Sequence, residues 1–245
     1  MVDKSENSYF STKLSADSLS AEGVTPKRTS AEIVAAELSW RIMVQQYPPG
    51  SRLREQELSG DFNVSRTVIR DVMGKLAARG FVEIHPWRGA TVVTYNSDEL
   101  ADLLELNAMV YGMLGRYAAE RRTPEHIANM ERILEMMTEL ADTVDNPEDF
   151  HVTRIEFFGV LNRATGSFFT GRQRANFPLT FYHQHVLADA STPELRQKQV
   201  AFFRELMQHL RDGAGKAAED CVYNNFMEKR AIVMQSLAAE AEAVA

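Results

Sequence analysis

Apolar side chains recur at helical spacing in the first third of the chain. A first helix is expected from residue 30 to residue 47, with Ser30 as its N-cap, until Pro48-Pro49-Gly50 forces a turn. A shorter helical stretch covers residues 54–62 and ends at Asn63. Two helices separated by a tight turn are therefore predicted here.

A third helix is expected to begin at Ser65 and to end near Gly80, which suits a helix C-cap. Its inner side is predicted to hold Val68, Ile69, Val72, Met73, Leu76 and Ala77. Two β-rich runs follow, residues 81–84 and 90–93, separated by His-Pro-Trp-Arg-Gly. This pattern predicts a β-hairpin after the third helix.

The pattern changes after residue 96, because no strand-like alternation of any length remains. Breaks containing Pro or Gly separate long helical windows at residues 98–121, 124–143, 148–164, about 167–189, 194–211 and 215–240. The predicted fold class is mainly α. Three helices and a hairpin wing are followed by an all-α bundle of about six helices.

Charge divides the chain into the same parts. Residues 1–28 are rich in Ser, carry no net charge and are expected to be a disordered tail. Residues 29–95 hold eight basic and seven acidic side chains, whereas residues 96–245 carry the remaining net charge of −8. The total of −7 would argue against a nucleic-acid partner, but the acidity belongs to the C-terminal part.

Composition excludes several classes of protein. Cys221 is the only cysteine, so no disulfide can form within the chain and a reducing compartment is expected. No apolar run is long enough to span a membrane, and the first ten residues lack the apolar core of a secretory signal. We therefore expect a cytoplasmic protein with no membrane partner.

The two helices at residues 54–62 and 65–80 have the pattern of a helix-turn-helix, whose second helix reads bases from the DNA major groove. Its exposed positions would be Ser65, Arg66, Thr67 and Arg70. Arginine suits guanine edges and phosphates, and hydroxyls suit phosphates near a helix N-terminus. The alternative is that Ser65 is only an N-cap and that the two arginines are solvated surface charges.

One continuous segment, residues 48–93, resembles the winged-helix domain of the GntR family of bacterial transcription regulators. The resemblance lies in PPG at 48–50, Leu53/Glu55/Leu58, VSRTVIR at 64–70, Leu76, GFV at 80–82 and Arg88-Gly89. Val68 departs from the family, which usually has Pro there, but the two arginine positions are kept. The segment is thus expected to bind double-stranded operator DNA.

The resemblance also implies roles for single residues. The implied DNA-binding set is Gln56 from the preceding helix, Ser65, Arg66, Thr67 and Arg70 from the recognition helix, and His85, Arg88 and Gly89 at the wing tip. We expect glycine at position 89 because a backbone close to DNA leaves no room for a side chain. Trp87 is expected to pack on the protein rather than to wedge into the minor groove.

The C-terminal helices are similar to the FCD domain, the effector-binding and dimerisation domain of the FadR-like subgroup. Many such domains bind a metal through an Asp-x-x-x-His pair and two further histidines, and the positions that correspond here hold Arg154, Phe158, Phe203 and Asn225. None of the first three suits a metal, and Asn107 replaces a frequent effector-binding arginine. The remaining histidines lack a complete set of partners on their own helices, so neither a metal nor another cofactor is expected.

Two interpretations of this domain stay open. In the first, the domain binds an apolar organic acid in a cavity: Arg154 pairs with its acid group, and Asn107 or Asn225 gives hydrogen bonds. The aromatic surface of that cavity would come from Tyr111, Phe157, Phe158, Phe202 and Phe203. In the second, the phenylalanines fill the cavity and the domain only dimerises.

We expect a homodimeric, ligand-responsive regulator, a repressor of a palindromic operator, and not an enzyme. The rival is an enzyme or small-molecule carrier in which the winged helix binds other proteins. No Ser-His-Asp, Cys-His, paired-carboxylate or phosphate-loop pattern supports catalysis.

Overall fold

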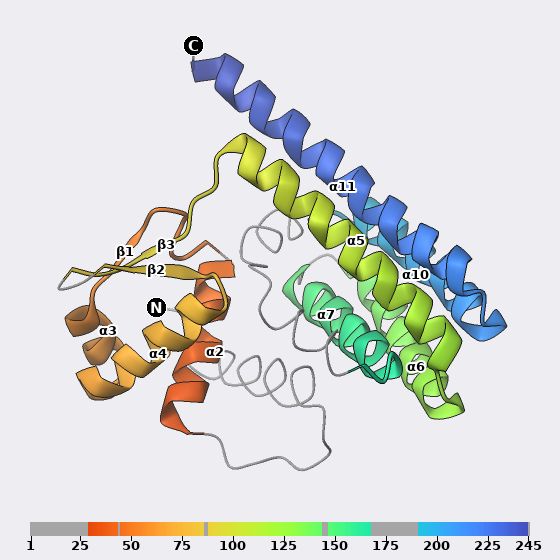
Figure 1. Ribbon diagram of the computed structural model, residues 1–245, viewed down its shortest axis with the longest axis horizontal. Coiled ribbons are helices and arrows are strands. Elements are labelled where there is room, and N and C mark those ends of the chain that lie inside the picture. The colour runs from red at the N-terminus through yellow and green to blue at the C-terminus, as the bar shows by residue number, and fades with distance from the viewer. Residues whose placement is uncertain (1–28, 44, 86–87, 144–146, 168–190, 245) are drawn as a thin grey trace. The chain divides into compact units, whose positions relative to one another are not determined.

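The computed structural model describes residues 29–43, 45–85, 88–143, 147–167 and 191–244 (Figure 1). The chain divides into two compact units between Thr94 and Tyr95. Of the described residues, those up to Thr94 belong to the first unit and those from Tyr95 onward belong to the second. Each unit has its own buried apolar core.

The first unit has the predicted order of helices followed by a hairpin. Its elements are α2 Ser30–Met43, β1 Arg52–Leu53, α3 Glu55–Asp61, α4 Arg66–Ala78, β2 Val82–His85 and β3 Gly89–Val92. The three strands form one antiparallel sheet in the order β1-β3-β2. The two-residue strand β1 was not predicted, because two residues are too few to show alternation.

The cap of the first helix is Thr29, so the prediction of Ser30 is wrong. The Thr29 hydroxyl accepts a hydrogen bond from the Glu32 backbone N–H (3.3 Å), and the Glu32 carboxylate accepts one from the Thr29 N–H (2.8 Å). This reciprocal capping box requires an acidic residue three positions after the cap, which Ser30 lacks. Ser30 is instead the first residue of α2.

The turn residues behave as the sequence predicts. Asn63 takes the left-handed conformation (φ 51°) after α3, and Gly80 does the same (φ 69°) after α4. Ser65 is the N-cap of α4, and its hydroxyl accepts a hydrogen bond from the Val68 N–H (3.4 Å). Helix α4 is thereby held between two defined ends.

The second unit is helical throughout its described residues. It contains α5 Ser97–Arg121, α6 Pro124–Ala141, α7 Pro147–Ala164, α10 Pro193–Asp212 and α11 Gly215–Val244. Five of the predicted windows are confirmed, and the window at 167–189 lies almost wholly outside the described residues. Among these five helices, none is long and apolar enough to cross a membrane. The mainly helical fold class is confirmed.

Helices α5 and α11 run side by side for most of their length (Figure 1). Two glycines of α5 allow this approach. A Cβ added at Gly115 would lie 2.8 Å from the Ala218 carbonyl oxygen, and one at Gly112 would lie 3.2 Å from the Glu219 carbonyl oxygen. Near the other end, the Arg230 guanidinium donates to the Ala101 carbonyl (3.1 Å). The two helices are therefore antiparallel and in close backbone contact.

We predict that Gly115→Ala lowers the free energy of unfolding by about 2 kcal/mol, since the new methyl group meets backbone that cannot move away alone. Gly112→Ala is the matched control and should cost less, because its nearest backbone atom is farther away. Urea unfolding followed by circular dichroism measures both. Equal midpoints for the wild type and Gly115→Ala would show that the two helices do not pack this closely.

Candidate functional site: a DNA-binding surface and an aromatic cluster

Helix α4 has one buried side and one exposed side. Ile69, Val72 and Leu76 have no exposed surface, and Met73 is 4% exposed. The four residues predicted to face DNA, Ser65, Arg66, Thr67 and Arg70, are all exposed. The predicted division of the helix is thus observed, and Gln56 on α3 is exposed as well.

The two arginines of this surface differ in their surroundings. Arg70 Nε lies 3.0 and 2.9 Å from the two carboxylate oxygens of Glu55. This hydrogen bond, and then the charge of Glu55, raise the pKa of Arg70 above its usual value. Among the described residues, no ion pair or side-chain hydrogen bond involves Arg66, so its guanidinium is open to a ligand.

The pair of Arg70 with Glu55 was not found from the sequence, because the two residues are 15 positions apart on different helices. Within the described residues, no hydrogen bond uses the two Nη groups of Arg70, so these donors stay available to another acceptor. Glu55 therefore fixes the arginine at the surface without using all of its donors.

The wing is held by contacts to β1. Arg52 donates from Nε and Nη2 to the Arg88 carbonyl (3.2 and 3.0 Å), which fixes the turn before β3. The Arg88 residue itself is exposed. His85 Nε2 lies 2.8 Å from the Thr91 hydroxyl across the hairpin, so this ring already has a partner within the wing. Trp87 lies outside the described residues.

The structure explains why position 89 is glycine, and the explanation differs from the expected one. Its φ is +87°, and a Cβ there would lie 2.6 Å from the Leu53 carbonyl oxygen. Glycine is therefore required by the approach of β1 and by the backbone conformation, whether or not DNA is present. An explanation through DNA contact is not needed.

Aromatic rings from four helices meet in the second unit. Tyr111 of α5 stacks on Phe226 of α11 (centroids 4.6 Å apart) and meets Phe158 of α7 edge-on (5.2 Å). Phe203 of α10 lies 5.6 Å from Phe158. We call this group the aromatic cluster, and it consists of Tyr111, Phe157, Phe158, Phe202, Phe203 and Phe226.

The cluster brings together three of the residues predicted to bind an effector. Tyr111, Phe158 and Phe203 are all at least nine-tenths buried. Phe226 was missed by sequence reasoning, although it directly follows the predicted residue Asn225. The sequence does indicate Phe226 through its helical spacing from Val222, since both side chains are buried.

Buried polar side chains accompany these rings. Asn107 has no exposed surface and lies one turn before Tyr111. Neither its amide nitrogen nor its amide oxygen has a hydrogen-bond partner among the residues that the structure describes. The Oδ1 atom of Asn225 is also buried, with no partner in the described part of the chain. Each such group costs about 1–3 kcal/mol, so a polar ligand that met them would be favoured.

Arg154 is 3% exposed and lies one turn before Phe158 on α7. Its Nη2 is 2.7 Å from His151 Nδ1, which places a neutral histidine as the acceptor. The buried guanidinium is thus held in a defined orientation beside an aromatic residue of the cluster.

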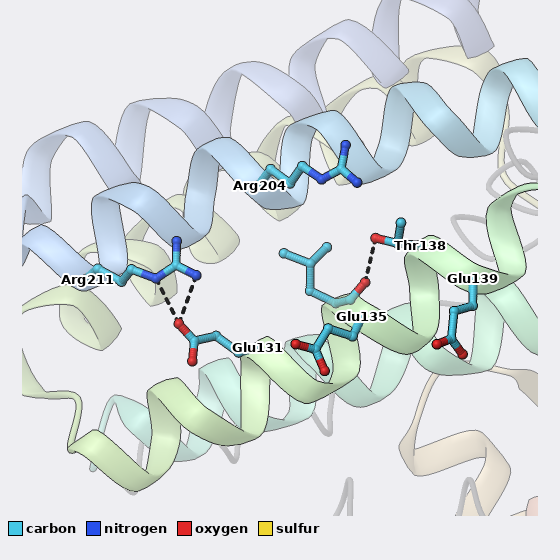
Figure 2. Close-up of a pocket in the computed structure, with 7 residues that line it drawn as sticks. Glu131, Glu135, Thr138, Glu139, Arg204 and Arg211 are labelled. Atoms are coloured by element: carbon cyan, nitrogen blue, oxygen red, sulfur yellow. Dashed lines mark hydrogen bonds and ion pairs between the residues drawn. The ribbon is translucent and has the colours of Figure 1, made fainter.

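An open groove of about 660 Å³ lies elsewhere, between α6 and α10 (Figure 2). Glu131, Glu135 and Glu139 follow one another along α6, and Arg204 and Arg211 face them from α10. Arg211 pairs with Glu131 at 2.8 Å. None of the predicted effector residues lines this groove. Its charged side chains belong to the contact between α6 and α10.

Comparisons with known proteins decide the family. Residues 30–92 match the family described as bacterial regulatory proteins, gntR family, and residues 102–226 match the FCD domain. The chain belongs to the GntR family and carries an FCD domain. It is therefore a DNA-binding transcriptional regulator, and its relatives are regulators rather than enzymes.

Two relatives of this GntR-family chain illustrate the match. The galactonate operon transcriptional repressor of Escherichia coli is 27% identical over 209 residues, which cover 74% of this chain and 88% of the repressor. An HTH-type transcriptional repressor NanR of Salmonella is 27% identical over 160 residues, 58% of this chain and 60% of that protein. The solved structure of E. coli McbR/YncC has the same fold, with a TM-score of 0.72 at 19% identity over 86% of this chain and 100% of that one.

The positions that hold a metal in many FCD domains do not fit one here. Arg154 would add positive charge, and Phe158 and Phe203 contribute rings to the aromatic cluster instead of ligand atoms. The one oxygen that Asn225 offers cannot hold a cation alone. These four side chains therefore do not form a metal-binding set.

We predict that Asn107→Leu raises the free energy of unfolding by about 1–2 kcal/mol, because it removes two unpartnered polar atoms and keeps the volume similar. Asn107→Asp should lower it, since a carboxylate would be buried there. Urea unfolding in the absence of ligands measures both variants. A destabilised Asn107→Leu would show that the protein itself satisfies this amide.

Proposed function

We propose that this regulator is a repressor that binds a palindromic operator as a homodimer and is released from it by a small organic acid. The observation that carries the proposal is the exposed first turn of α4, with Ser65, Arg66 and Thr67 facing away from a fully buried apolar side. Two relatives are named as repressors, which supports repression rather than activation.

The exposed residues of α4 and the wing suit contact with a DNA duplex. Arginine can donate two parallel hydrogen bonds to guanine O6 and N7, and the helix N-terminus attracts phosphate. Arg66 would read a base, while Arg70, held by Glu55, would meet a phosphate through its Nη groups. Arg88 at the exposed wing tip would meet the neighbouring phosphates or the minor groove.

Exposed apolar side chains on α5 support the homodimer. Leu106 is 51% exposed and Met109 is 52% exposed, and the two lie one turn apart on one side of the helix. A two-fold interface would bury this pair against the same pair of a second copy. Two winged helices would then meet two half-sites of a palindrome.

The effector would bind at the aromatic cluster. The rings suit an apolar body, Arg154 suits a carboxylate, and the unpartnered amide of Asn107 suits a hydroxyl or carbonyl group. A galactonate operon repressor among the relatives makes sugar acids one class to test beside aromatic acids. Effector binding and operator binding would oppose each other through linkage.

We predict that Arg66→Ala weakens binding to the operator about 10- to 100-fold, the loss expected for one good arginine–guanine contact. Gel-shift titrations with the DNA upstream of the protein's own gene, at one stated salt concentration, measure this. Glu55→Gln removes a negative charge and frees Arg70, so it should leave the affinity unchanged or raise it.

Arg132→Ala is the matched control, because Arg132 is 57% exposed and belongs to the helical unit. It should bind as the wild type does. If Arg66→Ala and Arg132→Ala bind the operator equally well, the assignment of α4 as the recognition helix is refuted.

We predict that a matching acid at 100 times its Kd raises the melting temperature by about 5–10 °C. Galactonate and phenylacetate are suitable first probes. Arg154→Ala should abolish the shift, and Asn107→Leu, which we expect to fold well, should reduce it strongly. A shift that survives in both variants would place the acid somewhere other than the aromatic cluster.

A further inference from the structure

Three metal-ligating side chains meet where α10 packs on α11. Glu205 and His209 are one turn apart on α10, with Oε1 and Nε2 3.8 Å from each other. Cys221 comes from α11, and one ligand atom from each of the three residues lies within 4.8 Å of those from the other two. Sequence reasoning missed this group because it compared His209 only with residues of its own helix.

The group is distinct from the metal positions common in FCD domains. Phe203, one of those positions, is fully buried, whereas Glu205 two residues later has a side chain that is 66% exposed. Two residues turn a helix by roughly 200°, so the two side chains leave α10 on nearly opposite sides. The group is also open to solvent, since the His209 side chain is 27% exposed.

The donor atoms suit one class of cation. Sulfur, imidazole nitrogen and carboxylate oxygen together favour Zn²⁺, which takes them at about 2.0–2.3 Å. In a tetrahedral site such ligand atoms are roughly 3.3–3.6 Å apart, so the contact of 3.8 Å is already close to that spacing. The exposed Glu205 side chain can rotate to bring its oxygen nearer the other two ligand atoms.

We propose that Glu205, His209 and Cys221 bind a thiophilic divalent cation such as Zn²⁺, with water as the fourth ligand, and thereby link α10 to α11. This departs from our expectation of no metal, which considered only the family positions and the partners available within one helix. The proposal does not depend on DNA binding or on an organic effector.

A cation at this site must compete with the proton of the Cys221 thiol. Burial, and then the negative charge of Glu205, raise the pKa of the Cys221 thiol to about 12. The same carboxylate that disfavours a thiolate attracts a cation, and a bound cation stabilises the thiolate directly. Binding should therefore release a proton from the thiol.

The link would act on the aromatic cluster as well. Phe202 and Phe203 belong to α10 and Phe226 belongs to α11, so the two helices form one wall of that cluster. Gln199 accepts a hydrogen bond from Lys229 (2.9 Å) toward the other end of the same pair of helices. A cation would add a link between side chains near the short turn that joins Asp212 to Gly215.

Titration of tag-free, full-length protein with Co²⁺ tests the proposal. Because Cys221 is the only cysteine, a thiolate-to-cobalt charge-transfer band in the near ultraviolet can come only from this residue. We expect the band in the wild type, one cation per chain, and loss of the band when Zn²⁺ is added. Cys221→Ser should abolish the band.

Competition with a chelator then gives the affinity for Zn²⁺. We expect His209→Gln and Cys221→Ser each to weaken it by at least about tenfold. His126→Gln on α6 is the matched control and should change nothing. No charge-transfer band in the wild type, or equal Zn²⁺ affinity in the wild type and His209→Gln, would overturn the proposal.

Discussion

The rotation of α4 about its own axis is set by three side chains with no exposed surface, Ile69, Val72 and Leu76. Turning the helix by one residue, roughly 100°, would carry these three side chains away from the core. In one direction it would also turn Arg70 inward, at a cost on the order of several kcal/mol. The apolar side therefore determines which polar groups face outward. The surface that we propose to bind DNA follows from core packing rather than from any preference of the arginines themselves.

Periodicity predicted most of the fold because each helix of this chain has an apolar side and a marked end. Asn63, Ser65 and Gly80 each fulfil a local requirement that a single residue type reveals. Ser30 failed because its neighbour Thr29 has the acidic partner that completes a capping box. The two residues of β1 were missed because pairing with β3, a long-range contact, is what makes them a strand.

Residues of the candidate sites could be predicted from the sequence only where the pattern within a single helix, or a family motif, indicates them. Phe158 and Phe203 were identified through a family resemblance and Tyr111 lies on the apolar stripe of its helix, and the structure shows that the three rings converge. Glu55 and Arg70 lie on different helices, so no spacing along the chain reveals their pair. Glu205 and His209 are spaced by one turn of α10, but only the fold brings Cys221 to them from α11. The sequence also cannot tell why position 89 is glycine, since a close approach between strands and a close approach to DNA both require one.

The second unit combines a well-packed interior with polar atoms that lack partners. Close contacts at Gly112 and Gly115 fix α5 against α11, yet Asn107 on the same α5 helix keeps an unpartnered amide in the interior. A domain that only dimerised would gain stability by replacing that amide with an apolar side chain. Its presence beside the aromatic cluster favours a ligand-binding role, at the expense of stability.

The central claim is that paired winged helices of this protein read a two-fold symmetric operator. Selection of bound sequences from a random pool of duplex DNA tests this claim directly, because the pool contains every candidate half-site. The account predicts an inverted repeat with half-site centres about one helical turn apart, which Arg66→Ala fails to enrich. Enrichment of no sequence, or of a single asymmetric site that Arg66→Ala selects equally well, would contradict it.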